Sequence, residues 1–128
     1  MSVLFVAIGG ALGALARHAA VSGVERITGR ALPWGTLAVN VVGSFALGFL
    51  LICADRWDLS PEWRRFAAVG FLGAFTTFSA FSFEISWFLR EEKWVTAGSY
   101  AIGSVLLGVA ALLGGSAAAS AIFAAPHS

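Results

Sequence analysis

The charged side chains of this 128-residue chain fall in a few short clusters, and this arrangement limits its possible folds more than any other feature. The clusters leave four long uncharged runs, at 1–16, 31–54, 66–83 and 94–128. A helix needs about 20 mostly apolar residues to span a bilayer. The second and fourth runs have that length, and the first and third reach it if Arg17 and Glu84 lie within the membrane. We therefore predict an all-α membrane protein with four transmembrane helices.

The composition excludes an ordinary soluble domain. Hydrophobic residues make up 59% of the chain and charged residues 12%, against about 45–50% and 25% in soluble proteins. This length corresponds to one domain, so residues 1–128 are expected to form a single transmembrane domain. The sequence has no carboxylate pair placed for acid–base catalysis, no nucleophile–base pair, no phosphate-binding loop and no basic tract. We therefore expect neither an enzyme nor a nucleic-acid-binding protein.

Turn-forming and charged segments separate the four predicted helices. These helices cover about residues 3–24, 34–55, 65–89 and 95–123. Five tryptophans fall near the proposed ends: Trp34, Trp57, Trp63, Trp87 and Trp94. Indole rings favour the headgroup level of a bilayer, so their positions support the boundaries. In the first helix, Gly9 and Gly13 have the small-residue spacing that predicts close helix packing.

The basic residues give almost no preferred orientation. With four spans, one side of the membrane carries Arg56, Arg64 and Arg65, and the other carries Arg26, Arg30, Arg90 and Lys93. Orientation normally follows an excess of Lys and Arg on the cytoplasmic side, and three against four is hardly an excess. Two explanations remain open: a noisy count in a small protein, or a chain that inserts both ways up and pairs antiparallel.

Polar groups inside a membrane are costly and are usually kept for a task. Asn40, Gly43 and Ser44 share one face of the second predicted helix, because they are three and four residues apart. The Asn40 amide offers two donors beside a nearly bare backbone. It could make a hydrogen bond between helices, or it could donate to an anion.

The third predicted helix is the least ordinary part of the chain. Residues 70–84 combine glycines, β-branched threonines and hydroxyl groups, which together weaken a helix in its middle. A break there would free backbone carbonyls for a cation, water or a protein donor. These residues alone still favour a continuous helix whose serines bond to the preceding turn.

Phe78 and Phe81 are neighbours on one face of the same segment, followed by Ser82 and Glu84 at helical spacing. Such rings usually serve packing. A ring edge, however, carries the positive end of the aromatic quadrupole, so phenyl edges beside hydroxyl donors could stabilise a small anion without a fixed charge.

Polar side chains on the first and fourth helices complete the candidates. Arg17 could extend to the membrane surface, or it could cap a helix break and attract anions. Tyr100 and Ser104, four residues apart, place two hydroxyls on one stripe of the fourth helix.

At these residues the chain resembles the Fluc fluoride-channel family, also called CrcB. The resemblance spans nearly the whole chain and rests on three motifs: G-A-L-G-A-L-A-R ending at Arg17, G-T-L-x-V-N-x-x-G-S-F over residues 35–45, and G-x-x-G-A-F-T-T-F-S-x-F-x-x-E over residues 70–84. The resemblance implies antiparallel dual-topology homodimers with the third helix broken mid-membrane. It also implies a structural sodium ion between subunits, held by the backbone carbonyls of Gly73 and Thr76.

The resemblance also assigns roles to individual side chains. The fluoride pore would be lined by Asn40, Phe78, Phe81, Ser79, Ser82, Tyr100 and Ser104, with Arg17, Thr77 and Glu84 in supporting positions. One departure is Ala80, which stands where many members have threonine and removes a hydroxyl from the polar stripe.

The resemblance therefore predicts a passive fluoride channel in the inner (plasma) membrane of a bacterium, where fluoride export would protect the cell. The alternative is a small dual-topology, proton-coupled exporter of organic cations that uses Glu84 as its proton-linked site.

Overall fold

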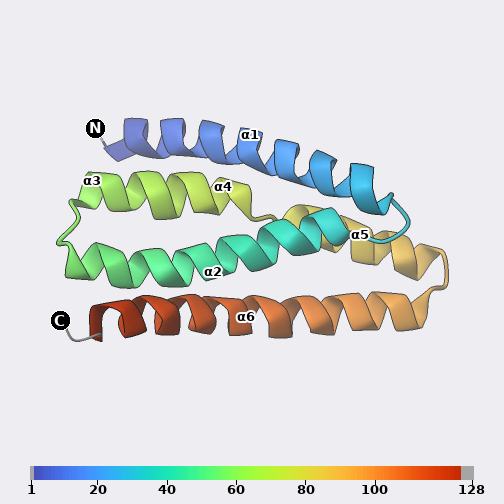
Figure 1. The fold of residues 1–128 in the computed structure, drawn as a ribbon. Helices are drawn as coiled ribbons and strands as arrows, with labels where there is room; N and C mark the ends of the chain where they lie inside the picture. Colours follow the sequence, from blue (N-terminus) through green and yellow to red (C-terminus); the bar gives the residue numbers. More distant parts are fainter. Residues whose placement is uncertain (1, 125–128) are drawn as a thin grey trace.

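The computed structural model describes residues 2–124, all of them in helices or short connections (Figure 1). The helices are α1 (Ser2–Thr28), α2 (Trp34–Arg56), α3 (Pro61–Arg64), η1 (Arg65–Leu72), α4 (Gly73–Phe75), α5 (Phe78–Arg90) and α6 (Trp94–Ala124). Helix η1 is a π-helix, and α3 to α5 together form one segment, Pro61–Arg90.

Four helical segments are long and apolar enough to cross a membrane, which confirms the prediction of four spans in an all-helical protein. The first span continues to Thr28, beyond the predicted end at residue 24. The third span begins at Pro61 rather than at residue 65. Proline suits the first turn of a helix because its missing N–H has no intrahelical partner there.

The spans form two closely packed pairs. Helix α1 packs mainly against η1 and α4, and α2 packs along α6. In Figure 1 the N-terminus, the C-terminus and the α2–α3 connection lie at one end, and the α1–α2 and α5–α6 connections lie at the other. Consecutive spans therefore run in opposite directions along the bundle.

Glycines allow the close approach of α1 to η1. Both Gly9 and Gly13 are buried, and a Cβ at Gly13 would lie 3.0 Å from the Cα of Phe71. A Cβ at Gly70 would lie 2.8 Å from the Val6 carbonyl oxygen. The packing predicted from the Gly9/Gly13 spacing is thus confirmed, and its partner is the π-helical part of the third span.

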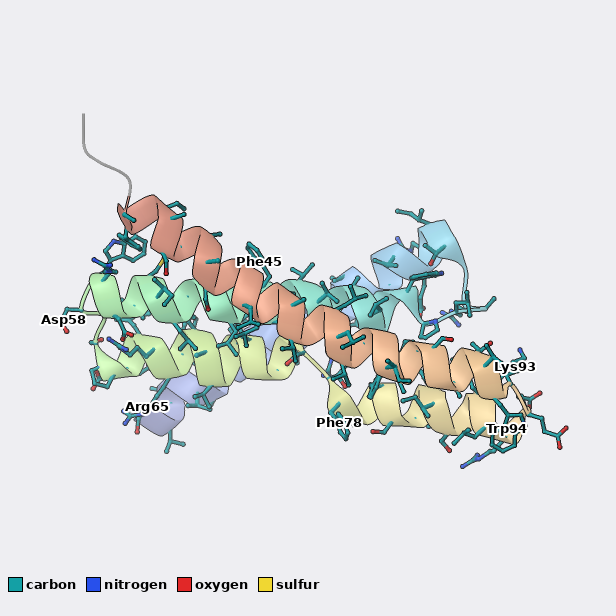
Figure 2. All side chains as sticks on the ribbon, turned by 90° about the horizontal axis from the view of Figure 1, so that it is seen from below. Phe45, Asp58, Arg65, Phe78, Lys93 and Trp94 are labelled. Atoms are coloured by element: carbon teal, nitrogen blue, oxygen red, sulfur yellow. The ribbon has the colours of Figure 1, made fainter. Side chains whose placement is uncertain are left out.

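Much of the apolar surface points outward. Large hydrophobic side chains are exposed along all four spans. Figure 2 shows Asp58 and Arg65 near one end of the bundle and Lys93 and Trp94 at the other. An apolar exterior between two charged ends suits a bilayer, where lipid replaces water as the solvent.

The third span is interrupted at Thr76 and Thr77. Thr76 has φ −83° and ψ 156°, and Thr77 has φ −147° and ψ 115°, so both residues are extended. The helix resumes at Phe78, where the Thr77 hydroxyl oxygen accepts a hydrogen bond from the Ala80 N–H at 3.1 Å. Thr77 is therefore the N-cap of α5, a position that favours threonine.

Candidate functional site at the interrupted helix

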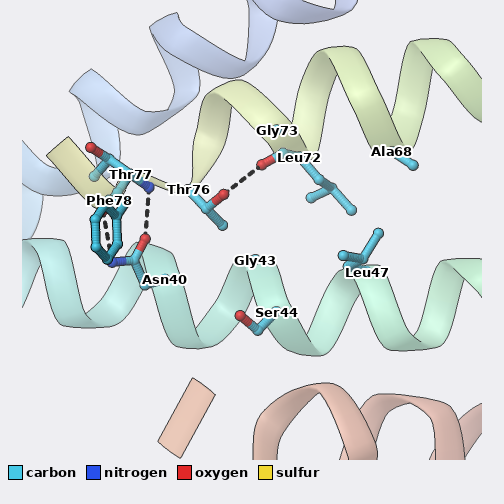
Figure 3. Close-up of a pocket in the computed structure, with 10 residues that line it drawn as sticks. All are labelled: Asn40, Gly43, Ser44, Leu47, Ala68, Leu72, Gly73, Thr76, Thr77 and Phe78. Atoms are coloured by element: carbon cyan, nitrogen blue, oxygen red, sulfur yellow. Dashed lines mark hydrogen bonds between the residues drawn. The ribbon is translucent and has the colours of Figure 1, made fainter. Parts of the chain in front are cut away.

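Asn40 of α2 bonds directly to the interruption (Figure 3). Its Oδ1 accepts from the Thr77 N–H at 2.7 Å, and its Nδ2 donates to the Thr77 carbonyl at 3.1 Å. In a continuous helix the Thr77 N–H would donate to the Gly73 carbonyl. The Asn40 amide therefore replaces a helical partner and stabilises the extended backbone, with one of its two N–H groups left for another acceptor.

Arg17 of α1 reaches the other residue of the interruption. Its Nη1 lies 3.5 Å from the Thr76 carbonyl oxygen, which accepts a long hydrogen bond. The Thr76 hydroxyl and N–H both donate back to the Leu72 carbonyl, at 3.0 and 3.1 Å. Side chains from α1 and α2 thus contact the two extended residues.

The residues named as sodium donors fit a hard cation chemically. The Gly73 carbonyl loses its usual helical donor because Asn40 binds the Thr77 N–H, and the Thr76 carbonyl keeps a second lone pair beside its bond to Arg17. Backbone carbonyl oxygens are suitable ligands for hard cations. Between residues 2 and 124 there is no cluster of three His, Cys, Asp or Glu side chains that could hold a metal.

Two phenyl rings and a hydroxyl border a cavity beside the interruption. This cavity, about 390 Å³, is lined by residues that include Asn40, Phe78, Phe81 and Ser104. The rings of Phe78 and Phe81 are 5.7 Å apart, and Phe78 is 78% exposed. The Ser104 Oγ is buried and has no hydrogen-bond partner among the described residues. A buried donor without a partner is costly, so this hydroxyl is available for a ligand.

A second, larger cavity lies on the opposite side of the first turns of α5. It measures about 490 Å³ and is lined by residues that include Arg17, Thr77, Ser79, Ala80 and Glu84. The hydroxyls of Thr77 and Ser79 are 3.3 Å apart. The residues predicted to line the pore are therefore divided, because Phe78 and Phe81 border one cavity and Ser79 borders the other. Ser82 is exposed and borders neither cavity.

Glu84 lies at the centre of a hydrogen-bonded cluster. Thr36 donates to Oε1 at 2.5 Å, and Tyr100 donates to Oε2 at 2.6 Å. The Tyr100 ring also lies 5.2 Å from the Phe81 ring, so the cluster adjoins the phenyl pair. The sequence analysis did not identify Thr36 as a partner of Glu84. Thr36 is nevertheless the threonine of the G-T-L-x-V-N motif, four residues before Asn40.

Comparison with known proteins agrees with these motifs. A model of the family described as "CrcB-like protein, Camphor Resistance (CrcB)" matches residues 4–116. The protein named "Fluoride-specific ion channel FluC" of Rhizobium leguminosarum bv. trifolii is 48% identical over 124 residues, covering 95% of this chain and 98% of its own. The protein of the same name from Koribacter versatilis is 39% identical, over 89% of this chain and 91% of its own. That from Geobacter sulfurreducens is 44% identical, over 83% of this chain and 86% of its own. The chain therefore belongs to the CrcB family.

Proposed function

We propose that this protein is a fluoride-selective ion channel that lets fluoride leave the cytoplasm passively. The observation that carries the proposal is the match to relatives named as fluoride-specific channels over nearly the full length of both chains. The cavity beside the interrupted helix supports it, because phenyl rings, an amide and an unpartnered hydroxyl gather there without a fixed positive charge. An ion channel is not an enzyme, and no catalytic residues are assigned.

Passive conduction is sufficient for export. Neutral HF crosses a bilayer more readily than the fluoride anion, dissociates in a less acidic interior and becomes trapped there. An open anion path then dissipates the accumulated fluoride without an energy source. Protection against fluoride toxicity follows from that path alone.

Several weak donors must act together to admit the ion. Transferring a carboxylate-sized ion from water to a dry interior costs on the order of 20 kcal/mol in the idealised limit, and a smaller ion costs more. The free N–H of Asn40, the Ser104 hydroxyl and the positive ring edges of Phe78 and Phe81 share that task. Weak donors also release the anion, whereas a fixed charge would hold it.

The working unit we propose is an antiparallel dual-topology homodimer in the inner (plasma) membrane of a bacterium. The near-even division of basic residues between the two ends supports insertion both ways up. The exposure of Phe78 supports a second subunit, since the cavity beside it is open on that face. In this arrangement the interruption lies mid-membrane.

The dimer would also complete the sodium site. The carbonyls of Gly73 and Thr76 from two subunits would together hold the ion between them, where its charge would stabilise the interrupted backbones. Replacing sodium by a large organic cation should then weaken the dimer or its function.

Liposome flux tests the channel. Vesicles that contain the purified protein and are loaded with fluoride should release it rapidly once a potassium ionophore prevents the build-up of a membrane potential. Vesicles loaded with chloride should release little chloride under the same conditions. Phe78→Ile and Phe81→Ile should each lower fluoride flux while the protein stays dimeric. Absence of fluoride efflux from correctly folded protein would end the proposal, and unchanged flux in both variants would exclude a role for the phenyl edges.

A further inference from the structure

Ser44 of α2 is half-buried in the wall of the cavity that contains the phenyl pair, and it has no role in the proposed pore so far. The residues that line this cavity of about 390 Å³ include Asn40, Ser44, Phe78, Phe81 and Ser104. Ser44 also lines a cavity of about 280 Å³ at the interruption, which Asn40 and Phe78 line as well. Ser44 therefore borders the same space as the phenyl rings and the unpartnered Ser104 hydroxyl.

Ser44 follows Asn40 by one helical turn. The two side chains share one face of α2, about 6 Å apart along its axis. Asn40 keeps one N–H for another acceptor after it has bonded to Thr77. Figure 3 shows Ser44 on the side of α2 that faces α6, and no hydrogen bond joins it to the other residues drawn there. This face of α2 thus offers the cavity two donors in succession.

Opposite Ser44, helix α6 offers no donor. A Cβ at Gly108 of α6 would lie 3.9 Å from the Ser44 Oγ, an ordinary van der Waals contact. Helices α2 and α6 run in the same direction (Figure 1), so the cavity continues past Ser104 toward the end of the bundle that carries the α2–α3 connection. In that part α6 lines it with Val105, Gly108, Val109, Leu112 and Leu113. Of the described lining residues, Ser44 is the one that offers a side-chain donor there.

We propose that the Ser44 hydroxyl is a further donor of the anion path, which binds fluoride next after Asn40 and Ser104 on the side of the α2–α3 connection. This inference rests on the proposed channel function. An ion that moves past the phenyl pair needs donors in place of its lost water, because an uncompensated ion is very costly in apolar surroundings. A serine hydroxyl can rotate its single O–H toward the ion, and it carries no charge that would hold the ion there.

Ser44→Ala removes the donor and keeps the Cβ. In the liposome assay, fluoride efflux should fall about tenfold, as expected when one hydrogen bond to an ion is lost. The melting temperature in detergent should stay close to that of the wild type, because the substitution breaks no hydrogen bond to the residues drawn around Ser44 in Figure 3. A hydroxyl that served packing alone would not give this separation of flux from stability.

A hydroxyl supplied from α6 should rescue the Ser44→Ala protein. Gly108→Ser places its Cβ 3.9 Å from the position of the lost Oγ, so its own hydroxyl can serve the same part of the cavity. The double variant should recover most of the lost efflux. Gly108→Ala in the same background is the matched control, since it adds the Cβ without a donor and should recover none.

The outcomes separate this inference from the channel itself. Unchanged efflux in Ser44→Ala, beside a wild type that conducts fluoride, would overturn the role of Ser44 and leave the channel function intact. The same conclusion follows if Gly108→Ser restores no efflux, or if Gly108→Ala restores as much. Absence of fluoride efflux from the wild type would overturn the channel function and the inference together. If Ser44→Ala does not elute as a folded protein, Ser44→Cys tests the same point, because a thiol is only a weak donor.

Discussion

Asn40 forms two hydrogen bonds with the backbone of a single residue, Thr77, through its carbonyl oxygen and its amide nitrogen. The amide thereby pairs with an extended residue as a neighbouring strand would. It supplies the donor and the acceptor that the interrupted helix cannot supply for itself. The same side chain thus stabilises the break and presents its remaining N–H to the cavity.

Replacing Asn40 by aspartate should damage both roles. The carboxylate keeps an acceptor for the Thr77 N–H but places an oxygen against the Thr77 carbonyl, which leaves a buried acceptor unsatisfied. The free energy of unfolding should fall by about 1–3 kcal/mol, and fluoride efflux should fall with it. Thermal unfolding in detergent and liposome flux would measure the two effects. Ser120→Ala, at an exposed position on α6 away from this cavity, is the control, and an equal loss in both variants would contradict a special role for Asn40.

Adding one methyl group to Gly13 should separate α1 from η1. The new Cβ would lie 2.9 Å from the Phe71 carbonyl carbon, so the helices must move apart, at a cost of about 1–3 kcal/mol in the free energy of unfolding. Gly23→Ala on the same helix is the control, because its added Cβ would meet no other helix and no side chain beyond its own chain neighbours within 4 Å. That variant should be neutral or slightly stabilised, since alanine favours helix more than glycine. Equal melting temperatures for the two variants would contradict the close approach.

Tyr100→Phe should isolate the bond to Glu84. The substitution removes the hydroxyl that donates to Oε2 and keeps the ring that packs against Phe81 and Phe88. The free energy of unfolding should fall by about 1–3 kcal/mol. In a Glu84→Ala background the same substitution should cost clearly less, because its partner is already absent. Additive losses would show that the two side chains act independently.

Glu84→Gln distinguishes the channel from the proton-coupled exporter. Glutamine offers one oxygen to two donors, so it should lower stability as one hydrogen bond is lost. Fluoride efflux should nevertheless continue without a pH gradient. Organic-cation uptake that requires such a gradient in the wild type and disappears in this variant would instead support the exporter.

Arg64→Lys should loosen the α2–α3 connection. The Arg64 guanidinium donates to the Asp55 carboxylate at 2.6 Å and to the carbonyls of Leu59 and Ala54 at 2.9 and 3.0 Å. A lysine ammonium lacks the planar fork that reaches all three acceptors. The free energy of unfolding, measured by thermal unfolding, should fall by about 0.5–1.5 kcal/mol. The loss is small because the site is partly exposed. Arg65→Lys, with the same change of chemistry at the next residue, should have a smaller effect.

The sequence predicts the spans well because a bilayer imposes a length and a polarity that are visible in one dimension. The positions of Trp34 and Trp94 at the starts of α2 and α6 reflect the same constraint. The sequence also identifies residues 70–84 as a weak helix, because glycines and β-branched threonines lower helix stability through local backbone and side-chain effects.

The sequence offered a helix-break cap for Arg17 and an interhelical bond for Asn40 as alternatives, and the structure shows both, but it did not identify the particular partner of either side chain or the role of Thr36. Thr36 and Glu84 are 48 positions apart, and Arg17 and Thr76 are 59 apart. Their contacts depend on how far each helix is rotated and shifted against its neighbours, which periodicity alone does not fix. The division of Ser79 and Phe81 between two cavities has the same origin, because it depends on which elements flank each side of α5.

The π-helix from Arg65 to Leu72 has a consequence for how related chains should be compared. Each hydrogen-bonded ring of a π-helix contains one residue more than that of an α-helix, so the two geometries advance around the axis at different angular rates. The segment therefore sets the rotational phase of everything that follows it, including the direction in which the Gly73 and Thr76 carbonyls leave the axis. Deleting a single residue here would preserve the hydropathy and the motifs of the span. It would nevertheless rotate the half of the span that follows about the helix axis. A helical wheel drawn for an uninterrupted α-helix would not reveal that rotation.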